Sequence, residues 1–121
     1  MAEGWLRYFS KDTIDIYSAG THPEPVNRYA VEVMSLQGID ISNYTSNHVN
    51  DYIEHDFDFI ITVCDNAEER CINLTNGRKK IHESFRDPAR AVGSYSEKIK
   101  IYSDVSDQLK EYFRNFFKEN F

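Results

Sequence analysis

The chain has 121 residues, of which 40% are hydrophobic and 14% aromatic, a composition that suits one globular domain with one core. Its formal net charge of −6 argues against nucleic acid or an anionic membrane as the main partner. No apolar run is long enough to span a bilayer, and the first residues lack the apolar core of a signal peptide. Together with only two cysteines, these features predict a protein of the reducing cytoplasm.

The first half of the chain alternates between helical and extended patterns. Apolar spacing predicts a helix over 1–9 and a second helix over 26–36, with Gly38 suited to the position just after its end. Residues 13–17 alternate in polarity and are expected to form a strand between these helices. Residues 46–54 are expected to hold a short helical turn.

The stretch from Phe57 to Cys71 carries the strongest chemical signal. Its apolar, β-branched run over 57–63 predicts a strand, and the lack of alternation predicts that both faces are buried in a parallel sheet. Cys64 stands at the carboxyl end of this strand, followed by acidic and polar residues up to Cys71. Ligands gather at the carboxyl ends of strands in open α/β sheets. The pair is therefore a candidate functional site, and two reduced thiols without a role are the alternative.

Geometry limits how these two thiols can react with each other. Cys64 and Cys71 lie seven positions apart, so their Cα atoms would be separated by roughly 10 Å if the residues between them were helical. A disulfide needs Cα atoms within about 7 Å. A bond between the two cysteines therefore requires the intervening segment to loop out or unwind.

The second half of the chain adds a short strand over 79–82, a loop, and a long helix over 96–118. Asp87 precedes Pro88, which favours extended backbone, so its side chain is expected to project from a loop. It is either a functional carboxylate or an ordinary turn residue. The four histidines show no metal-ligand spacing. The order of elements predicts an α/β fold with a parallel sheet flanked by helices.

Six motifs occur in an order that resembles the thioredoxin-coupled arsenate reductases of the low-molecular-weight tyrosine phosphatase superfamily. They are MAEGWLR, YSAGTHP, VNRYAVEVM, GIDISNYTSNH, DFDFIITVCDNAEERC and SFRDPA, and the resemblance covers roughly residues 1–93. It implies a four-stranded parallel sheet flanked by helices. Members of the family carry a loop with a nucleophilic Cys, five residues and an Arg just before the position of Met1. We therefore expect residues 1–121 to form a single, N-terminally truncated domain that lacks the first strand and the nucleophile and has no turnover alone.

The resemblance also implies roles for three residues of this chain. In the family, a nucleophilic thiolate attacks arsenate, and an Asp that matches Asp87 protonates the leaving oxygen. A second Cys, matched by Cys64, then releases arsenite, and a third Cys, matched by Cys71, attacks the resulting disulfide. Thioredoxin reduces the final disulfide, so the implied partners are thioredoxin and arsenate or a phosphate-like oxyanion, and no cofactor is implied.

The resemblance bears on a metal site as well. In some relatives, the positions of Glu3, Ser18, Thr45 and Asn47 form a potassium-binding set with a carboxylate at the last position. Asn47 lacks that charge, so no metal site is expected here.

Three functions remain open at the level of the sequence. The first is arsenate reduction, the second is a non-catalytic redox switch or interaction remnant that exchanges disulfides with thioredoxin, and the third is a low-molecular-weight tyrosine phosphatase. The pair of cysteines favours the first over the third, because simple phosphatase chemistry has no use for resolving thiols.

Overall fold

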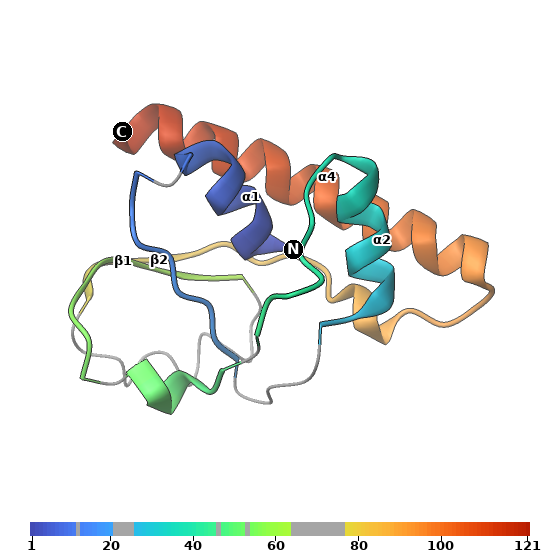
Figure 1. Ribbon diagram of the computed structural model, residues 1–121, viewed down its shortest axis with the longest axis horizontal. Helices are drawn as coiled ribbons and strands as arrows, with labels where there is room; N and C mark the ends of the chain where they lie inside the picture. The colour runs from blue at the N-terminus through green and yellow to red at the C-terminus, as the bar shows by residue number, and fades with distance from the viewer. Residues whose placement is uncertain (12, 21–25, 46, 53, 64–76) are drawn as a thin grey trace. The chain divides into compact units, whose positions relative to one another are not determined.

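The computed structural model describes residues 1–11, 13–20, 26–45, 47–52, 54–63 and 77–121 (Figure 1). Cys64 and Cys71 lie outside these residues. The elements, in chain order, are the helices α1 (Ala2–Ser10) and α2 (Arg28–Leu36), the 3₁₀ turn η1 (Val49–Tyr52), the strands β1 (Phe57–Thr62) and β2 (Gly77–His82), the 3₁₀ turn η2 (Pro88–Arg90) and the helix α4 (Tyr95–Asn120). None of the helices in these ranges is both long and apolar enough to cross a membrane.

The chain divides into two compact units, which are described separately. The first comprises residues 1–18, 25–45 and 87–121 and holds α1, α2, η2 and α4. The second comprises residues 19–24 and 46–86 and holds η1, β1 and β2.

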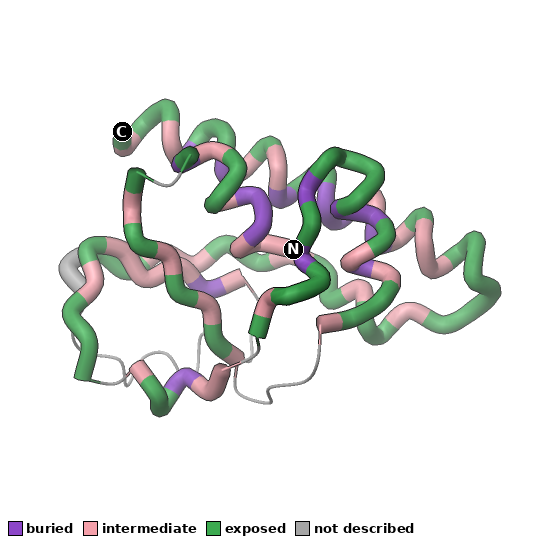
Figure 2. Tube along the Cα trace, viewed as in Figure 1, coloured by how far each residue is buried: buried purple, intermediate pink, exposed green. Residues whose placement is uncertain are grey.

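The core of the first unit forms where α1 and α2 pack against α4. Buried residues line the inner faces of these helices (Figure 2), and the largest fully buried side chains include Trp5, Met34, Ile41 and Phe113. Full burial of such a side chain contributes about 1.5–3 kcal/mol to stability. The three-and-four spacing of apolar residues predicted the buried faces of α2 and α4 correctly.

Local sequence signals set the helix ends in the first unit. The Asn27 side chain accepts a hydrogen bond from the Tyr29 backbone N–H at 2.8 Å and caps the start of α2. Gly38 follows the end of α2 with a φ of 78°, a left-handed conformation that glycine adopts without steric cost. Ser94 caps α4 through the Glu97 N–H. The predicted boundaries of both helices are correct to within two residues.

The second unit is built on a parallel pair of strands. β1 and β2 are in register from Phe57 opposite Gly77 to Thr62 opposite His82, which confirms the predicted parallel pairing. β1 is only partly buried, with Asp58 exposed and Phe59 intermediate, so the prediction that both its faces are buried was wrong for the described part of the chain. Val49 of η1 is buried, in agreement with the predicted helical turn.

The predicted strand over 13–17 is not a strand in the structure. Ile14 and Ile16 alternate with polar residues, but no neighbouring strand in the described residues pairs with this segment. The Ile16 carbonyl instead accepts a hydrogen bond from the Arg7 Nη2 at 3.1 Å. An alternating pattern gives a tendency to extend, whereas strand formation also needs a backbone partner.

Candidate active site

The strand that leads to Cys64 is held in place up to the residue before it. The Glu83 N–H donates to the Thr62 carbonyl and the Phe85 N–H to the Val63 carbonyl, each at 3.0 Å, so the parallel pairing continues beyond β1. Both cysteines themselves lie outside the described residues. The backbone is therefore held by the neighbouring strand up to Val63, the residue before Cys64.

The structure contains a polar pair at the carboxyl end of the two strands that was not predicted from the sequence. The Thr62 Oγ1 and the His82 Nδ1 lie 2.6 Å apart, and Thr62 is 8% exposed. Either the hydroxyl or the imidazole N–H donates this hydrogen bond. The only signal in the sequence is a polar residue near the end of an apolar strand; the register that brings His82 opposite Thr62 is a tertiary feature.

Asp87 lies in the extended geometry that its position before Pro88 predicts, with φ −80° and ψ 105°. Its Oδ1 accepts a hydrogen bond from the Ala89 N–H at 3.0 Å, and the Arg90 Nε lies 3.8 Å from its Oδ2. The Asp87 side chain is 49% exposed. The carboxylate is thus oriented by a turn of its own backbone and remains open to solvent and to a substrate.

The turn that carries Asp87 packs against α4. The phenol of Tyr102 on that helix is buried. Burial raises the pKa of Tyr102, and the negative charge of Asp87 raises it further. The Asp87 charge therefore acts on a buried phenol that stays neutral at neutral pH.

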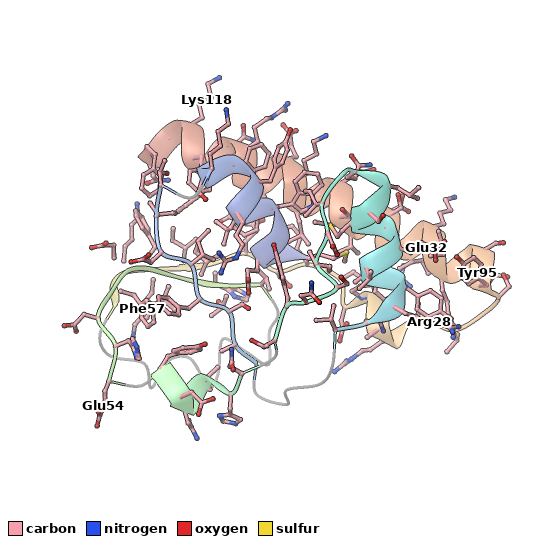
Figure 3. All side chains as sticks on the ribbon, viewed as in Figure 1. Arg28, Glu32, Glu54, Phe57, Tyr95 and Lys118 are labelled. Atoms are coloured by element: carbon pink, nitrogen blue, oxygen red, sulfur yellow. The ribbon has the colours of Figure 1, made fainter. Side chains whose placement is uncertain are left out.

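A second cluster joins the start of α2 to the start of α4 (Figure 3). The Tyr95 hydroxyl donates a hydrogen bond to Glu32, which raises the pKa of Tyr95. The Arg28 Cζ and the Lys98 Nζ lie 5.0 Å and 5.8 Å from the centre of the Tyr29 ring. A hydrogen bond from Arg28 lowers the pKa of the Tyr29 phenol. The contacts of Tyr95 with Glu32 and of Lys98 with Tyr29 join the two helices.

The residues implied in potassium binding do not fit a potassium ion. The Glu3 carboxylate already accepts a hydrogen bond from the Ser18 hydroxyl through Oε1, and its Oε2 accepts one from the Arg7 Nε at 2.8 Å. Arg7 supplies the positive charge that an ion would bring, and a second cation beside it would be repelled. Asn47 also lacks the charge that relatives have at its position.

Comparison with known proteins places this geometry in a family. The family model described as low molecular weight phosphotyrosine protein phosphatase matches residues 1–120. The chain belongs to this family. The resemblance that the sequence motifs carried is therefore confirmed.

Within the family, the chain is similar to curated arsenate reductases. It is 36% identical to the arsenate reductase of Bacillus subtilis over 116 residues, and 37% identical to that of Bacillus licheniformis over the same length. The arsenate reductase of Halalkalibacterium halodurans is 34% identical. Each match covers 96% of this chain and 84% of the relative.

Solved structures of the same fold support the architecture. A structure titled "An arsenate reductase in oxidized state" aligns with a TM-score of 0.82, and one titled "An arsenate reductase in the phosphate binding state" aligns with a TM-score of 0.80. Both are 23% identical, and the matches cover 98% of this chain and 86% of each relative. The α/β class with a parallel sheet and helices, predicted from the order of elements, is confirmed.

Proposed function

We propose that this chain carries the resolving half of an arsenate reductase, with Cys64 and Cys71 as a thiol relay and Asp87 as the proton donor. The observation that supports this most is the similarity to curated arsenate reductases over 84% of their length. The motifs that carry Cys64, Cys71 and Asp87 lie within the matched family region. The substrate in this proposal is arsenate or a phosphate-like oxyanion.

The chemistry of the relay balances as a two-electron reduction. A nucleophilic thiolate, which is neither Cys64 nor Cys71, displaces one arsenate oxygen as water, with a proton from Asp87, and forms a sulfur–arsenic bond. The Cys64 thiolate attacks that sulfur, the electron pair of the sulfur–arsenic bond passes to arsenic, and arsenite leaves. Cys71 then attacks the sulfur of Cys64, which yields a Cys64–Cys71 disulfide and frees the nucleophile.

The surroundings of Asp87 are compatible with its proposed role. Its side chain is half exposed, so a bound oxyanion could receive its proton. The ion pair with Arg90 spans 3.8 Å between two exposed side chains, and such pairs contribute about 0–1 kcal/mol. Arg90 therefore does not lock the carboxylate away from a substrate.

Thioredoxin is the proposed reductant of the final disulfide. The proposed location is the cytoplasm, and residues 1–121 are proposed to form a single domain. If the residues between the cysteines are helical, the expected separation of roughly 10 Å requires that segment to open before the two thiols bond. An opened segment with an exposed disulfide suits reduction by a small dithiol protein. A redox switch that exchanges disulfides without arsenate turnover is the alternative of another class.

One feature of the sequence favours a phosphatase as the second candidate. Cys64 and Arg70 have the spacing of the family's catalytic loop, a Cys and an Arg separated by five residues. The intervening segment contains Asp65, Glu68 and Glu69, whose charges oppose the binding of an oxyanion. The reductase therefore remains the preferred function.

The proposal is tested with the protein isolated from its natural source, where the substitutions are introduced in the chromosomal gene, so that its termini are natural. Arsenate-dependent oxidation of NADPH is measured with thioredoxin and thioredoxin reductase. Loss of turnover in Cys64→Ser and in Cys71→Ser, with retained folding, supports the relay. Turnover that survives both substitutions refutes it. Hydrolysis of an aryl phosphate that depends on Cys64 but not on Cys71 would establish the phosphatase instead.

The relay also makes a prediction for the oxidised protein. Treatment of residues 1–121 with peroxide is expected to form an intramolecular Cys64–Cys71 disulfide, detected by mass spectrometry after alkylation of free thiols. Formation of intermolecular dimers alone would count against a relay within one chain.

A further inference from the structure

Positive charge collects in the first unit, around the starts of α2 and α4. Arg28 lies in the first turn of α2, Lys98 in the first turn of α4, and Arg90 at the end of η2. Both α2 and η2 pack against α4, so the three cations stand on neighbouring elements of the same unit (Figure 1). The chain as a whole has a net charge of −6, and this local excess of cations therefore contrasts with the rest of the protein.

Two tyrosine rings lie beside these cations (Figure 3). The Arg28 Cζ and the Lys98 Nζ lie 5.0 Å and 5.8 Å from the centre of the Tyr29 ring. The centre of the Tyr95 ring lies 5.8 Å from that of Tyr29, and Tyr95 is 50% exposed. The basic aromatic surface is the name used below for Arg28, Tyr29, Arg90, Tyr95 and Lys98.

The basic aromatic surface borders the turn that carries Asp87. The Tyr29 ring stacks on the buried ring of Tyr102, with the two centres 5.5 Å apart. The charge of Asp87 raises the pKa of the Tyr102 phenol, and the Arg90 Nε lies 3.8 Å from the Asp87 Oδ2. Because η2 packs against α4, Arg90 lies at the edge of the basic aromatic surface nearest to Asp87.

The nearby carboxylates are engaged by the chain itself, whereas two of the cations are not neutralised. Glu32 accepts a hydrogen bond from the Tyr95 hydroxyl, and Glu97 accepts one from the serine that caps α4. In the described part of the chain, neither Arg28 nor Lys98 forms an ion pair with a carboxylate. Their charges are therefore available to an anionic partner.

The chemistry of the basic aromatic surface favours an acidic polypeptide over a small oxyanion. Arg28, Arg90 and Lys98 stand on three different elements, and one exposed ion pair in water contributes little to binding. A polypeptide with several carboxylates engages more than one of the cations, and guanidinium groups bind carboxylates in a bidentate manner. Tyr95 and the neighbouring Val92, which is 85% exposed, add contact area for the side chains of a polypeptide.

Nucleic acid fits the basic aromatic surface less well than an acidic polypeptide does. A duplex carries one charge per roughly 1.7 Å of its axis, so its charges cannot be spaced to avoid Glu32 and Asp87. The net charge of −6 also repels a long polyanion that extends beyond the surface. In a polypeptide the carboxylates are separated by neutral residues, and the charged segment can be short.

We propose that the basic aromatic surface binds an acidic segment of a partner protein. The carboxylates of the segment pair with Arg28, Arg90 and Lys98, and an aromatic or apolar side chain of the segment packs against Tyr29 and Tyr95. A bound segment then lies beside the turn of Asp87. This inference goes beyond the proposed reductase function and does not depend on it.

The test measures the binding of a synthetic peptide to the full chain. The probe is a fluorescently labelled peptide of glutamates with one central tryptophan, and the control peptide has glutamine in place of every glutamate. Fluorescence anisotropy gives the dissociation constant of each peptide. The key variant combines Arg28→Gln with Lys98→Gln. The matched control combines Arg114→Gln with Lys118→Gln, which removes the same charge about 30 Å further along α4.

The proposal expects the glutamate peptide to bind, with an affinity that falls as salt is added, and the glutamine peptide not to bind. The double variant at Arg28 and Lys98 binds about tenfold more weakly, because two exposed charge pairs are lost. The control variant binds like the natural chain. In NMR spectra the peptide shifts the ring signals of Tyr29 and Tyr95 but not those of Tyr8 on α1.

If the double variant does not fold, as judged by circular dichroism, Arg28→Gln alone is compared with Arg114→Gln alone. The expected order of affinities is the same, with a smaller difference because one charge pair is lost instead of two.

Four outcomes would overturn the proposal. Equal affinity of the two double variants means that the cations of the basic aromatic surface do not bind the peptide. Displacement of the peptide by phosphate, but not by sodium chloride of equal ionic strength, assigns the surface to a small oxyanion. Tighter binding of a single-stranded oligonucleotide of equal charge assigns it to nucleic acid. A dimer in sedimentation experiments that the Arg28 and Lys98 substitutions abolish assigns it to a second copy of the chain. None of these measurements involves arsenate turnover, so the failure of this inference and that of the proposed function are distinguishable.

Discussion

The indole N–H of Trp5 donates a hydrogen bond to the hydroxyl of Ser106, 3.1 Å away, and thereby joins α1 to the middle of α4. Both residues are about 1% exposed, so this is a polar contact inside an apolar interface. The Ser106 hydroxyl in turn lies 3.4 Å from the Met34 Sδ of α2, to which it donates. One hydroxyl on α4 therefore makes polar contacts with both α1 and α2.

Replacement of this hydroxyl is expected to destabilise the protein. Ser106→Ala leaves the buried indole N–H without an acceptor, which costs about 1–3 kcal/mol of unfolding free energy. Ser96→Ala on the exposed part of α4 is the control and should cost less than about 0.5 kcal/mol. Urea denaturation measures both. Equal stabilities of the two variants would show that the hydrogen bond does not stabilise the interface.

The close approach of α1 to its neighbours at Gly4 leads to a second prediction. A Cβ atom at Gly4 would lie 2.8 Å from the Met34 Cε and 3.0 Å from the Ile41 Cγ2. Alanine is the better helix former by about 1 kcal/mol, but overpacking costs about 1–3 kcal/mol. Gly4→Ala is therefore expected to lower the free energy of unfolding, as measured in urea.

The matched experiment for Gly4 uses the side chain that obstructs the new methyl group. In a Met34→Ala background the flexible Met34 terminus is gone, so Gly4→Ala should cost less than in the natural chain. If Gly4→Ala stabilises the natural chain by the helix-propensity difference, the packing at this position is looser than the structure indicates.

The elements that could be predicted from the sequence are those that nearby residues in the chain determine. The helical face of α4, with Leu109 and Phe113 buried, follows from apolar spacing, and the extended geometry of Asp87 follows from Pro88. The segment over 13–17 was predicted wrongly because a strand depends on a partner that alternation alone does not specify. An alternating pattern of polarity indicates that the backbone tends to be extended. Whether it pairs with another strand depends on residues far away in the sequence.

The same distinction between local and distant causes applies to the contacts around the candidate site. The spacing of Glu3 and Arg7 by four positions is a recognisable helical pair, but their contacts with Ile16 and Ser18 depend on the path of a segment without regular structure. The contact of Thr62 with His82 follows from the register of β1 and β2, which no local signal sets. The roles of Cys64 and Cys71, outside the described residues, stay predictions.

Asp87 caps η2 and is the proposed proton donor, and one substitution separates the two roles. Asparagine also caps a turn, so Asp87→Asn should keep the contact with the Ala89 N–H and the melting temperature while it removes the proton donor. Arsenate turnover in the natural protein is then expected to fall by about 10²–10⁴-fold. Asp104→Asn on the exposed face of α4 is the control. Unchanged turnover in Asp87→Asn would assign Asp87 a purely structural role.

The buried phenol of Tyr102 predicts how stability depends on alkaline pH. Burial, and then the charge of Asp87, raise the pKa of Tyr102 in the folded protein above its ordinary value. The folded state thus holds this proton more tightly than the unfolded state does. The resulting stability is fully present below the ordinary tyrosine pKa of about 10 and is lost as the pH rises through the folded pKa.

Tyr102→Phe tests this dependence because phenylalanine has no proton to lose. Between about pH 9 and about pH 11 the natural chain should lose more unfolding free energy than Tyr102→Phe, since only the natural chain must ionise a buried phenol. Tyr17→Phe, at a side chain that is half exposed, is the control and should follow the natural chain. Urea denaturation across this pH range provides the measurement. Parallel pH profiles of the natural chain and Tyr102→Phe would mean that the Tyr102 phenol ionises as readily in the folded protein as in the unfolded chain.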